Sequence, residues 1–418
     1  MNEILSDARK IIHNAIQASL PDEAVKKALC GMTFDFQGRV IVIAIGKAGW
    51  NMARAAAENL PHSIDTGIVL TKYGHAKGAI PGFTILEAGH PLPDENTISG
   101  TEKIISAVSH LSEKDTVFFL VSGGGSALFE RPAGSLTLAD FLDITDQLLK
   151  CGADIVEINT IRKHLSAVKG GKFAQLCAPA RVHCIALSDI LGDRPDSIAS
   201  GPACPDASTS AEALAIAEKY QLKLTEEMKR LLAIETPKAL SNVTMEVTGS
   251  VTQLCRDAAE TASSLGYSPL ILTNMLDCEA REAGRFLASV AKTIQKDGLP
   301  LSPPCAILCG GETVVHITGK GKGGRNHELA LAAAAGIDGM KGVVIAAVGS
   351  DGTDGPTDAA GGIVDGGTCN LLAKRGISIP AVLAENDSNA ALAAADALLV
   401  TRPTGTNVND LYFLLCKE

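Results

Sequence analysis

The sequence predicts an α/β protein of two domains, the first built on a parallel sheet that helices cover on both faces. The chain has 418 residues, which is more than one ordinary hydrophobic core holds. Hydrophobic residues make up 46% of it but aromatic residues only 4%, so aliphatic side chains must form the cores, as is typical of helices packed on parallel strands. Residues 117–121 (VFFLV) are continuously apolar, as a strand buried on both faces requires.

The first predicted unit of this fold is a strand, a glycine turn and a helix. The strand covers residues 39–45, the turn contains Gly46 and Lys47, and the helix begins at Trp50. This is the first half of a βαβ unit, the building block of doubly wound parallel sheets. The turn reads AxGxxG, only a weak match to the dinucleotide fingerprint. Because a lysine at a helix N-terminus adds a full charge where anions already bind, Lys47 and Gly46 are candidate contacts for an anionic substrate.

A second glycine turn follows the apolar strand at 117–121. It consists of Ser122, Gly123, Gly124, Gly125 and Ser126. Glycines let main-chain N–H groups approach a ligand closely, and the two hydroxyls add donors. The turn therefore predicts a cradle for an anion such as phosphate, and the alternative is a plain flexible loop.

Positive charge gathers locally in a chain whose formal net charge is −10. Arg162 and Lys163 lie in a basic cluster over residues 159–172, which would supply that charge near the glycine turns. The alternative is an ordinary solvated helix face. His90, in the turn GHPLPDEN, is a further candidate substrate contact, although a turn histidine is commonly only a hydrogen-bonding spacer.

Aspartates at the ends of predicted strands indicate a magnesium site. Asp189 and Asp193 follow the strand at 181–187, and Asp351 and Asp354 follow the strand at 343–348. Carboxylates near phosphate-binding turns are what Mg²⁺ requires, but aspartates are also ordinary turn formers.

The domain boundary is predicted in the polar stretch after a charged helix, which gives domains of residues 1–240 and 245–418. The second domain contains Glu312 in a GGET turn, Arg325 after a loop of glycines and lysines, and Asn407 in the last glycine-centred loop. No GxxxxGK[ST] occurs in the chain, so neither domain carries a Walker motif.

Composition excludes several classes of partner. The acidic net charge argues against nonspecific nucleic-acid binding and against an anionic membrane surface. No apolar run is long enough for a membrane span, and the N-terminus lacks a signal-peptide pattern. The eleven cysteines form no disulfide or zinc framework, which suits a reducing compartment. We therefore expect a soluble cytoplasmic protein.

In their order along the chain, the motifs resemble those of the class II glycerate kinases, whose older label is hydroxypyruvate reductase. The matching segments are IAIGKAGW, GHPLPDEN, VSGGGSAL, INTIRKHLSAVKGGKFA, LSDILGD, IASGP, CGGET, GGRNHELAL, GSDGTDGPTDAAG and TGTNVNDL. The resemblance implies a Rossmann-like N-terminal domain and a C-terminal α/β domain called MOFRL. It also implies ATP- and Mg²⁺-dependent phosphorylation of D-glycerate to 2-phosphoglycerate, with Lys47 and Arg325 as the catalytic pair.

These observations together predict a full site. ATP is expected at the turn of residues 122–126 and at Glu312 and Asn407, glycerate at Gly46, His90, Arg162 and Lys163, and Mg²⁺ at the four aspartates. Since Lys47 and Arg325 belong to different predicted domains, one shared reaction requires an interdomain cleft.

Two alternatives to the kinase remain open at this stage. One is an NAD(P)H-dependent hydroxypyruvate reductase, which the AxGxxG turn and Lys72 favour. The other is a non-catalytic sugar-phosphate-binding module. The oligomeric state also stays open, a homodimer being one option.

Overall fold

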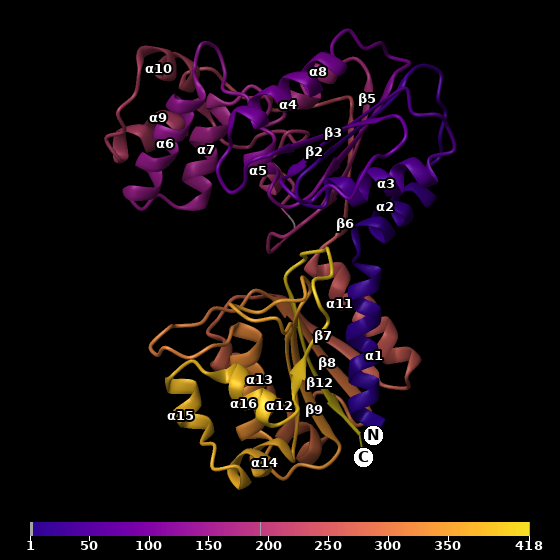
Figure 1. The fold of residues 1–418 in the computed structure, drawn as a ribbon, viewed down its shortest axis with the longest axis vertical. Coiled ribbons are helices and arrows are strands. Elements are labelled where there is room, and N and C mark those ends of the chain that lie inside the picture. Colours follow the sequence, from indigo (N-terminus) through magenta and orange to yellow (C-terminus); the bar gives the residue numbers. More distant parts are fainter. Residues whose placement is uncertain (1–2, 193, 418) are drawn as a thin grey trace. The chain divides into compact units, whose positions relative to one another are not determined.

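The computed structural model describes residues 3–192 and 194–417, which form two compact units. Within the described residues, the first unit holds residues 21–188 and 194–248, and the second unit holds residues 3–20, 189–192 and 249–417 (Figure 1). No helix of the described chain is long and apolar enough to cross a membrane.

The first unit is built on a six-stranded sheet in the order β3-β2-β1-β4-β5-β6. Its strands are β1 (Val40–Ile45), β2 (Thr66–Lys72), β3 (Phe83–Ala88), β4 (Thr116–Val121), β5 (Arg181–Leu187) and β6 (Val243–Gly249). Strands β1 to β5 pair in parallel, and every residue of β1 and β4 is buried. The order reverses direction between β1 and β4, and in such sheets ligands bind beyond the carboxyl ends of the strands at this switch point.

Helices cover both faces of the first sheet. Helices α2 (Pro21–Cys30) and α3 (Gly49–Asn59) pack on one face around Phe118 and Leu120. On the other face lie α4 (Glu95–Ala107) and α8 (Lys172–Cys177), whose Phe173 ring centre is 4.5 Å from that of Phe119 (Figure 1). Alternate residues of one strand thus face opposite helical layers, which explains why the strand reads as a continuous apolar run.

A small helical group extends the first unit. The short α5 (Gly125–Leu128) follows β4, and α6 (Leu138–Lys150), α7 (Ile155–Leu165), α9 (Ser210–Lys219) and α10 (Glu226–Leu232) pack around a core of their own. Asp154 begins α7, because its carboxylate accepts hydrogen bonds from the N–H groups of Val156 and Glu157. The 3₁₀ turn η1 (Ile198–Ser200) lies between β5 and α9.

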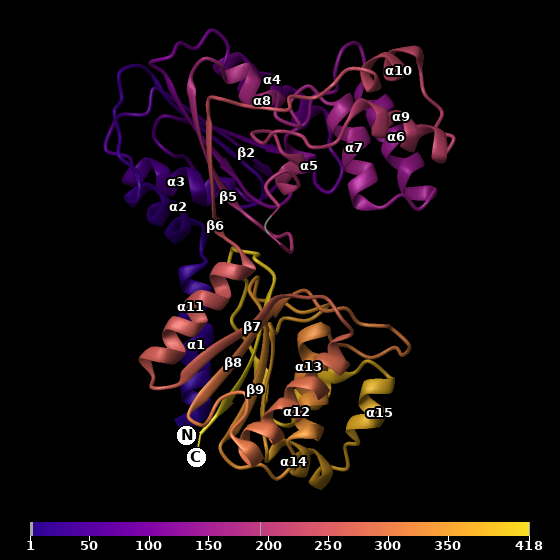
Figure 2. The same cartoon turned by 180° about the vertical axis from the view of Figure 1, so that it is seen from behind.

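The second unit has a mixed sheet in the order β11-β10-β9-β12-β8-β7. The strands are β7 (Ser268–Leu276), β8 (Cys305–Gly311), β9 (Val343–Gly349), β10 (Gly361–Asp365), β11 (Leu398–Leu399) and β12 (Asp410–Cys416), with β12 antiparallel to both β8 and β9. Helices α12 (Ala280–Asp297) and α13 (Arg325–Gly336) cover one face, while α1 (Glu3–Ala18) and α11 (Val251–Ser264) cover the other (Figure 2). The remaining helices are α14 (Thr368–Lys374), α15 (Ile379–Ala384) and α16 (Ser388–Ala394). The predicted α/β fold class with two domains is confirmed.

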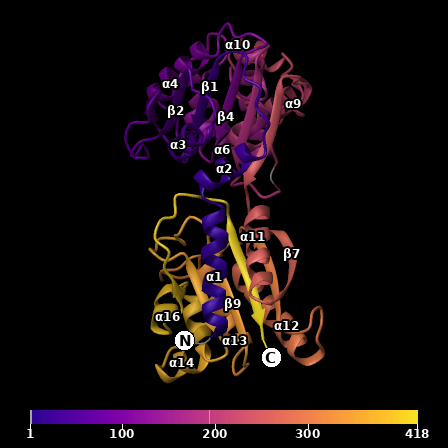
Figure 3. The ribbon, with the colours of Figure 1, turned by 90° about the vertical axis from the view of Figure 1, so that its right-hand side faces the viewer.

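The units depart from the predicted boundaries of 1–240 and 245–418 at both ends. Helix α1 belongs to the second unit, where Ile4, Ile11 and Ile16 join the core under α11 (Figure 3). Lys417 strengthens this attachment, because its Nζ lies 2.9 Å from the Glu3 carboxylate. Residues 243–248 form β6 of the first sheet, so the chain leaves the first unit after residue 248.

Candidate active site

The two predicted glycine turns meet at the switch point of the first sheet. The Lys47 N–H donates to the carbonyl oxygen of Gly123 at 2.9 Å, and the Ala48 N–H donates to Ser122 Oγ at 3.0 Å. Ser122 Oγ in turn donates to the carbonyl oxygen of Ile45 at 3.1 Å. Gly46 has φ +101°, and a Cβ there would collide with Ser122. The turns after β1 and β4 are therefore locked into one surface.

This surface exposes main-chain donors. Within the described chain, the N–H groups of Gly123, Gly124 and Ser126 donate to no main-chain carbonyl, whereas the Gly125 N–H donates to Ser122 O at 3.3 Å. Gly124 adopts φ +83°, which glycine tolerates and which turns its peptide away from the helical direction. Unpaired N–H groups clustered at one turn are what an anion requires.

Lys47 and His90 lie over this turn. A Cβ built on Gly124 would be 3.1 Å from Lys47 Cε and 3.1 Å from His90 Nε2, so both side chains touch the glycine. Burial and the charges of Lys47 and Lys72 lower the pKa of His90, which favours a neutral imidazole beside a cation. The first unit thus brings Gly46, Lys47, His90 and the turn of residues 122–126 together, as predicted.

Arg162 was predicted to contact glycerate, but in the structure it contacts the main chain of the same turn. Its Nη2 donates to the carbonyl oxygen of Ser126 at 3.1 Å, and the guanidinium carbon lies 5.4 Å from the centre of the Phe141 ring. Because Arg162 contacts a carbonyl rather than the side of the turn that presents N–H groups, its contacts favour holding the turn over binding glycerate.

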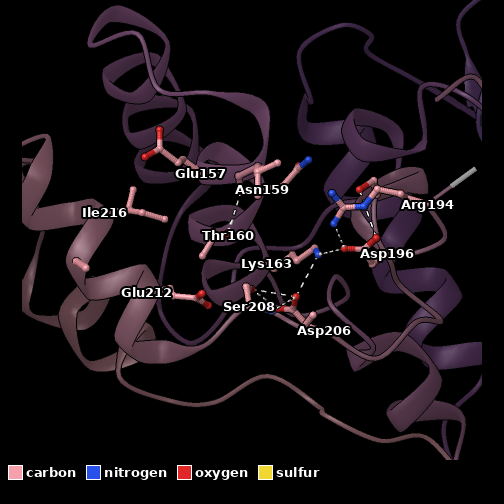
Figure 4. A pocket seen from close by; sticks show the side chains of 14 residues that line it. Glu157, Asn159, Thr160, Lys163, Arg194, Asp196, Asp206, Ser208, Glu212 and Ile216 are labelled. Carbon is pink, nitrogen blue, oxygen red and sulfur yellow. Dashed lines mark hydrogen bonds and ion pairs between the residues drawn. The ribbon is translucent and has the colours of Figure 1, made fainter. Parts of the chain in front are cut away.

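Lys163, one residue later, is committed to a buried ion pair. Its Nζ lies 3.1 Å from Asp206 and 3.6 Å from Asp196, and Asp196 also pairs with Arg194 at 3.1 Å. These four side chains line a pocket of about 420 Å³ between α7 and α9 (Figure 4). Since both cations already have carboxylate partners, these surroundings do not favour the predicted role of Lys163 as a glycerate contact.

Arg325 forms a second cluster, within the second unit. Its Nη1 lies 3.0 Å from Glu312, and its Nε and Nη2 both donate to Asp410, the latter at 3.2 Å. Tyr412 OH donates to Asp410 at 2.9 Å and accepts from the Thr313 N–H at 3.1 Å. Arg325 is therefore held on two sides by carboxylates, one of them anchored by a buried tyrosine.

Asp410 is a site residue that the sequence prediction missed. Strand register places it opposite Gly311 of β8 and Gly349 of β9, so it lies between the loops that carry Glu312 and Asp351. Burial raises its pKa to about 6, against the opposing effect of Arg325. The signal in the sequence was a lone acid opening an otherwise apolar strand.

A neighbouring asparagine differs from the one predicted. Asn407 is exposed, and its side-chain oxygen accepts from the Asn409 N–H at 3.3 Å. Asn409 is buried, and its Nδ2 donates to Glu312 Oε2 and to the carbonyl oxygen of Asp189, each at 3.1 Å. In the structure Asn409, rather than Asn407, joins the Arg325 cluster, and a role for Asn407 in binding ATP stays a prediction.

Of the four predicted magnesium ligands, the structure describes Asp189, Asp351 and Asp354. Within the described residues, no three His, Cys, Asp or Glu side chains form a group that would hold a metal, and Asp193 lies outside those residues. Asp354 anchors the start of α13 by accepting from the His327 N–H at 2.8 Å, whereas Asp351 accepts from the Thr353 N–H at 3.0 Å. Because Mg²⁺ takes only one or two carboxylates and completes its shell with water and phosphate, Asp351 fits a metal that arrives with a nucleotide.

The fold and these clusters define a class: a two-unit α/β protein with a Rossmann-type sheet and a turn of unpaired main-chain N–H groups at its switch point. Residues 7–233 match the family model described as a domain of unknown function, DUF4147, and residues 305–410 match the MOFRL family.

Named relatives match over nearly the whole chain. The D-glycerate 2-kinase of Thermotoga maritima is 53% identical, covering 97% of this chain and 96% of the relative, and the glycerate 2-kinase of Pyrococcus horikoshii is 42% identical, covering 96% and 95%. A putative hydroxypyruvate reductase of Agrobacterium vitis is 41% identical, covering 97% and 93%. The crystal structure of a Thermotoga maritima glycerate kinase superposes with a TM-score of 0.96 at 52% identity, over 100% of both chains. The chain belongs to this glycerate kinase family, and the resemblance seen in the sequence is confirmed.

Proposed function

We propose that the protein is a glycerate 2-kinase, which transfers the γ-phosphoryl group of ATP to the 2-hydroxyl of D-glycerate. One observation carries this proposal: Lys47 lies over a glycine turn with unpaired N–H groups, at the switch point of the first sheet. The high identity to a D-glycerate 2-kinase over nearly the full length supports it.

Phosphoryl transfer asks a protein for charge and positioning more than for covalent chemistry. The N–H groups of Gly123, Gly124 and Ser126 would bind phosphate oxygens, and the Lys47 ammonium would stabilise the charge on the transferring group. A neutral His90 beside Lys47 would donate to or accept from a substrate hydroxyl. Each of these roles needs only a direct contact with an anion or hydroxyl at the surface described above.

Arg325 would supply a second positive charge. Its two carboxylate partners differ in exposure: the Glu312 side chain is 44% exposed and that of Asp410 only 2%. A substrate anion would therefore displace Glu312, while Asp410 keeps the guanidinium in place. The shared action of Arg325 and Lys47 on one phosphoryl group, in an interdomain cleft, stays a prediction.

Magnesium belongs to the proposal as a companion of ATP. When bound, it would neutralise negative charge on the phosphate groups, and Asp351 would help to hold it. Asp351 is the residue whose contacts best suit such a metal, and Asp189, Asp193 and Asp354 stay predicted ligands. The contacts of ATP with Glu312 and Asn407 also stay predictions.

The cellular setting is also a proposal. All eleven cysteines lie in the described part of the chain and are free thiols, which supports the predicted reducing cytoplasm. The homodimer stays an option that only a measurement of mass in solution decides.

The assay that tests the proposed function compares two reactions. The protein is incubated with D-glycerate, ATP and Mg²⁺, and separately with hydroxypyruvate and NADH. We expect ADP to form only when D-glycerate is present. Consumption of NADH would favour the reductase, and a folded protein silent in both reactions would favour a binding module.

A further inference from the structure

Lys169 is a fully buried lysine, with a side chain that is 0% exposed. Its Nζ donates to the carbonyl oxygens of Ser126 and Phe129, each at 2.9 Å, and lies 3.2 Å from the carboxylate of Glu130, which is also fully buried. Three partners match the three hydrogens of an ammonium group. All of them belong to residues 126–130, which begin with the last residue of the glycine turn after β4.

A second cation reaches the same carbonyl. Arg162 Nη2 donates to Ser126 O at 3.1 Å, so Ser126 O accepts from both Arg162 and Lys169. Two positive charges and the one negative charge of Glu130 leave a buried net charge of +1 next to the turn. Ser126 Oγ is fixed as well, through a 2.9 Å hydrogen bond to Ser200 Oγ.

Ser126 is the residue at which this network meets the anion surface. Its N–H is one of the three in the turn with no main-chain acceptor, while its carbonyl and hydroxyl are both held from the protein side. The carbonyl belongs to the peptide unit after Ser126 and the N–H to the unit before it, so these hydrogen bonds act on the N–H by fixing the position of the Ser126 Cα between the two units.

We propose that Lys169 is a positioning residue: its ammonium holds the turn of residues 122–126 in the geometry that binds phosphate, without touching the substrate itself. This inference rests on the proposed function only in taking ATP as the ligand of the turn.

The ion pair with Glu130 does not by itself account for a lysine at this position, because burial opposes its charge. Burial lowers the pKa of Lys169 to about 8, with Arg162 acting in the same direction and Glu130 opposing them. A buried ion pair is often replaced by apolar side chains without loss of stability. The hydrogen bonds to Ser126 and Phe129, in contrast, have no apolar substitute.

The chain offers a matched control in Lys172. Its Nζ donates to the carbonyl oxygens of Lys163 at 2.9 Å, His164 at 3.1 Å and Ser166 at 2.6 Å, at the end of α7. Burial lowers its pKa to about 8 as well. Lys172 is thus a buried lysine bound to three carbonyls, none of them in the segment of residues 122–130.

The test measures the Kd of ATP and the melting temperature for the wild type, Lys169→Met and Lys172→Met. We expect Lys169→Met to weaken ATP binding by about tenfold or more, the loss of roughly one charged hydrogen bond. Lys172→Met should leave the Kd within about twofold while lowering the melting temperature at least as much. Equal Kd values for Lys169→Met and the wild type would overturn the inference, and so would equal weakening in both variants. A wild type that binds no ATP would instead overturn the proposed function.

A second variant covers the case in which Lys169→Met does not fold. Glu130→Gln keeps the shape of the pair but removes the charge that raises the pKa of Lys169. Lys169 loses its charge as the pH rises through its pKa, so ATP binding should weaken there. In Glu130→Gln this loss of ATP binding should begin at a lower pH than in the wild type. An unchanged pH dependence would overturn the inference.

Discussion

Lys47 is the residue on which the phosphoryl-transfer account depends most. Replacing it with alanine removes the cation over Gly124 and should lower kcat/KM by about two orders of magnitude or more, as losing one charge-stabilising donor often does. Steady-state kinetics with D-glycerate and ATP measure this. Lys77→Ala, which removes an exposed lysine in the loop after β2, is the control and should behave as the wild type. Near wild-type kinetics for Lys47→Ala would remove Lys47 from the site.

Asp410 gives the account a pH dependence with a definite sign. Its pKa is raised to about 6, so the carboxylate is ionised and holds Arg325 above that pH and becomes protonated below it. We expect kcat/KM to fall as the pH drops below about 6, and Asp410→Asn to show lower activity without that ionisation. A pH profile of Asp410→Asn identical to that of the wild type would contradict this.

Protein unfolding does not explain the expected loss of activity. A carboxyl whose folded pKa lies above its unfolded value binds more protons in the folded state, so Asp410 lowers the unfolding free energy as the pH rises from about 4 to 6 and adds no further change above it. Through this group, acid stabilises the fold while it releases Arg325. The contribution of Asp410 to the unfolding free energy should therefore move opposite to activity between pH 4 and 6, and comparing the unfolding free energies of the wild type and Asp410→Asn measures it.

Sequence reasoning could propose candidate residues around the glycine turns but could not show which side chains pair across the fold. Gly46, Gly124 and Lys47 stand out because glycines after buried strands have few other uses. The segment INTIRKHLSAVKGGK contains several basic residues. The sequence pattern does not show that Lys163 pairs with Asp206, whereas Lys169 donates to Ser126. Those partners are distant in sequence, and the pairing depends on how α7 packs.

At the scale of elements, the loop of residues 319–324 shows how one pattern serves two purposes. Glycines interleaved with lysines are typical of an anion-binding loop, but a Cβ at Gly319 or Gly321 would collide with Glu385 or Asp387. The Lys322 N–H also donates to the Asp387 carboxylate at 3.0 Å. Close packing against the segment before α16 accounts for these glycines, while the exposed side chains of Lys320 and Lys322 keep their charge at the surface.

Helix α1 provides the prediction at this scale. Ile11 is fully buried against the second unit, so Ile11→Ala should lower the unfolding free energy by about 2–5 kcal/mol. Hydrogen exchange should accelerate in α11 and β9, and remain unchanged in β1 and β4. Ile155→Ala, which trims an isoleucine that is 66% exposed, should have little effect anywhere. Equal acceleration in both units after Ile11→Ala would contradict the placement of α1.

At the scale of the whole molecule, the sequence predicts the fold class but not the exact residues that make up each of the two units. Strands such as β1 and β4 are visible because they are wholly apolar, and their glycine turns predict the parallel arrangement that the structure has. The apolar face of α1 shows only that this helix packs on something; it does not show whether the partner is the first or the second unit. Assigning it needs the tertiary structure.

The position of the transferred phosphate tests the central claim most directly. The protein is incubated with D-glycerate, ATP and Mg²⁺, and the product is examined by ³¹P NMR with proton coupling. Phosphate on the 2-hydroxyl is attached to a carbon with one hydrogen and gives a doublet, whereas phosphate on the 3-hydroxyl is attached to a CH₂ group and gives a triplet. The account predicts the doublet of 2-phosphoglycerate, formed together with ADP. A triplet, or the absence of any phosphorylated glycerate from a folded protein that consumes NADH with hydroxypyruvate, would contradict it.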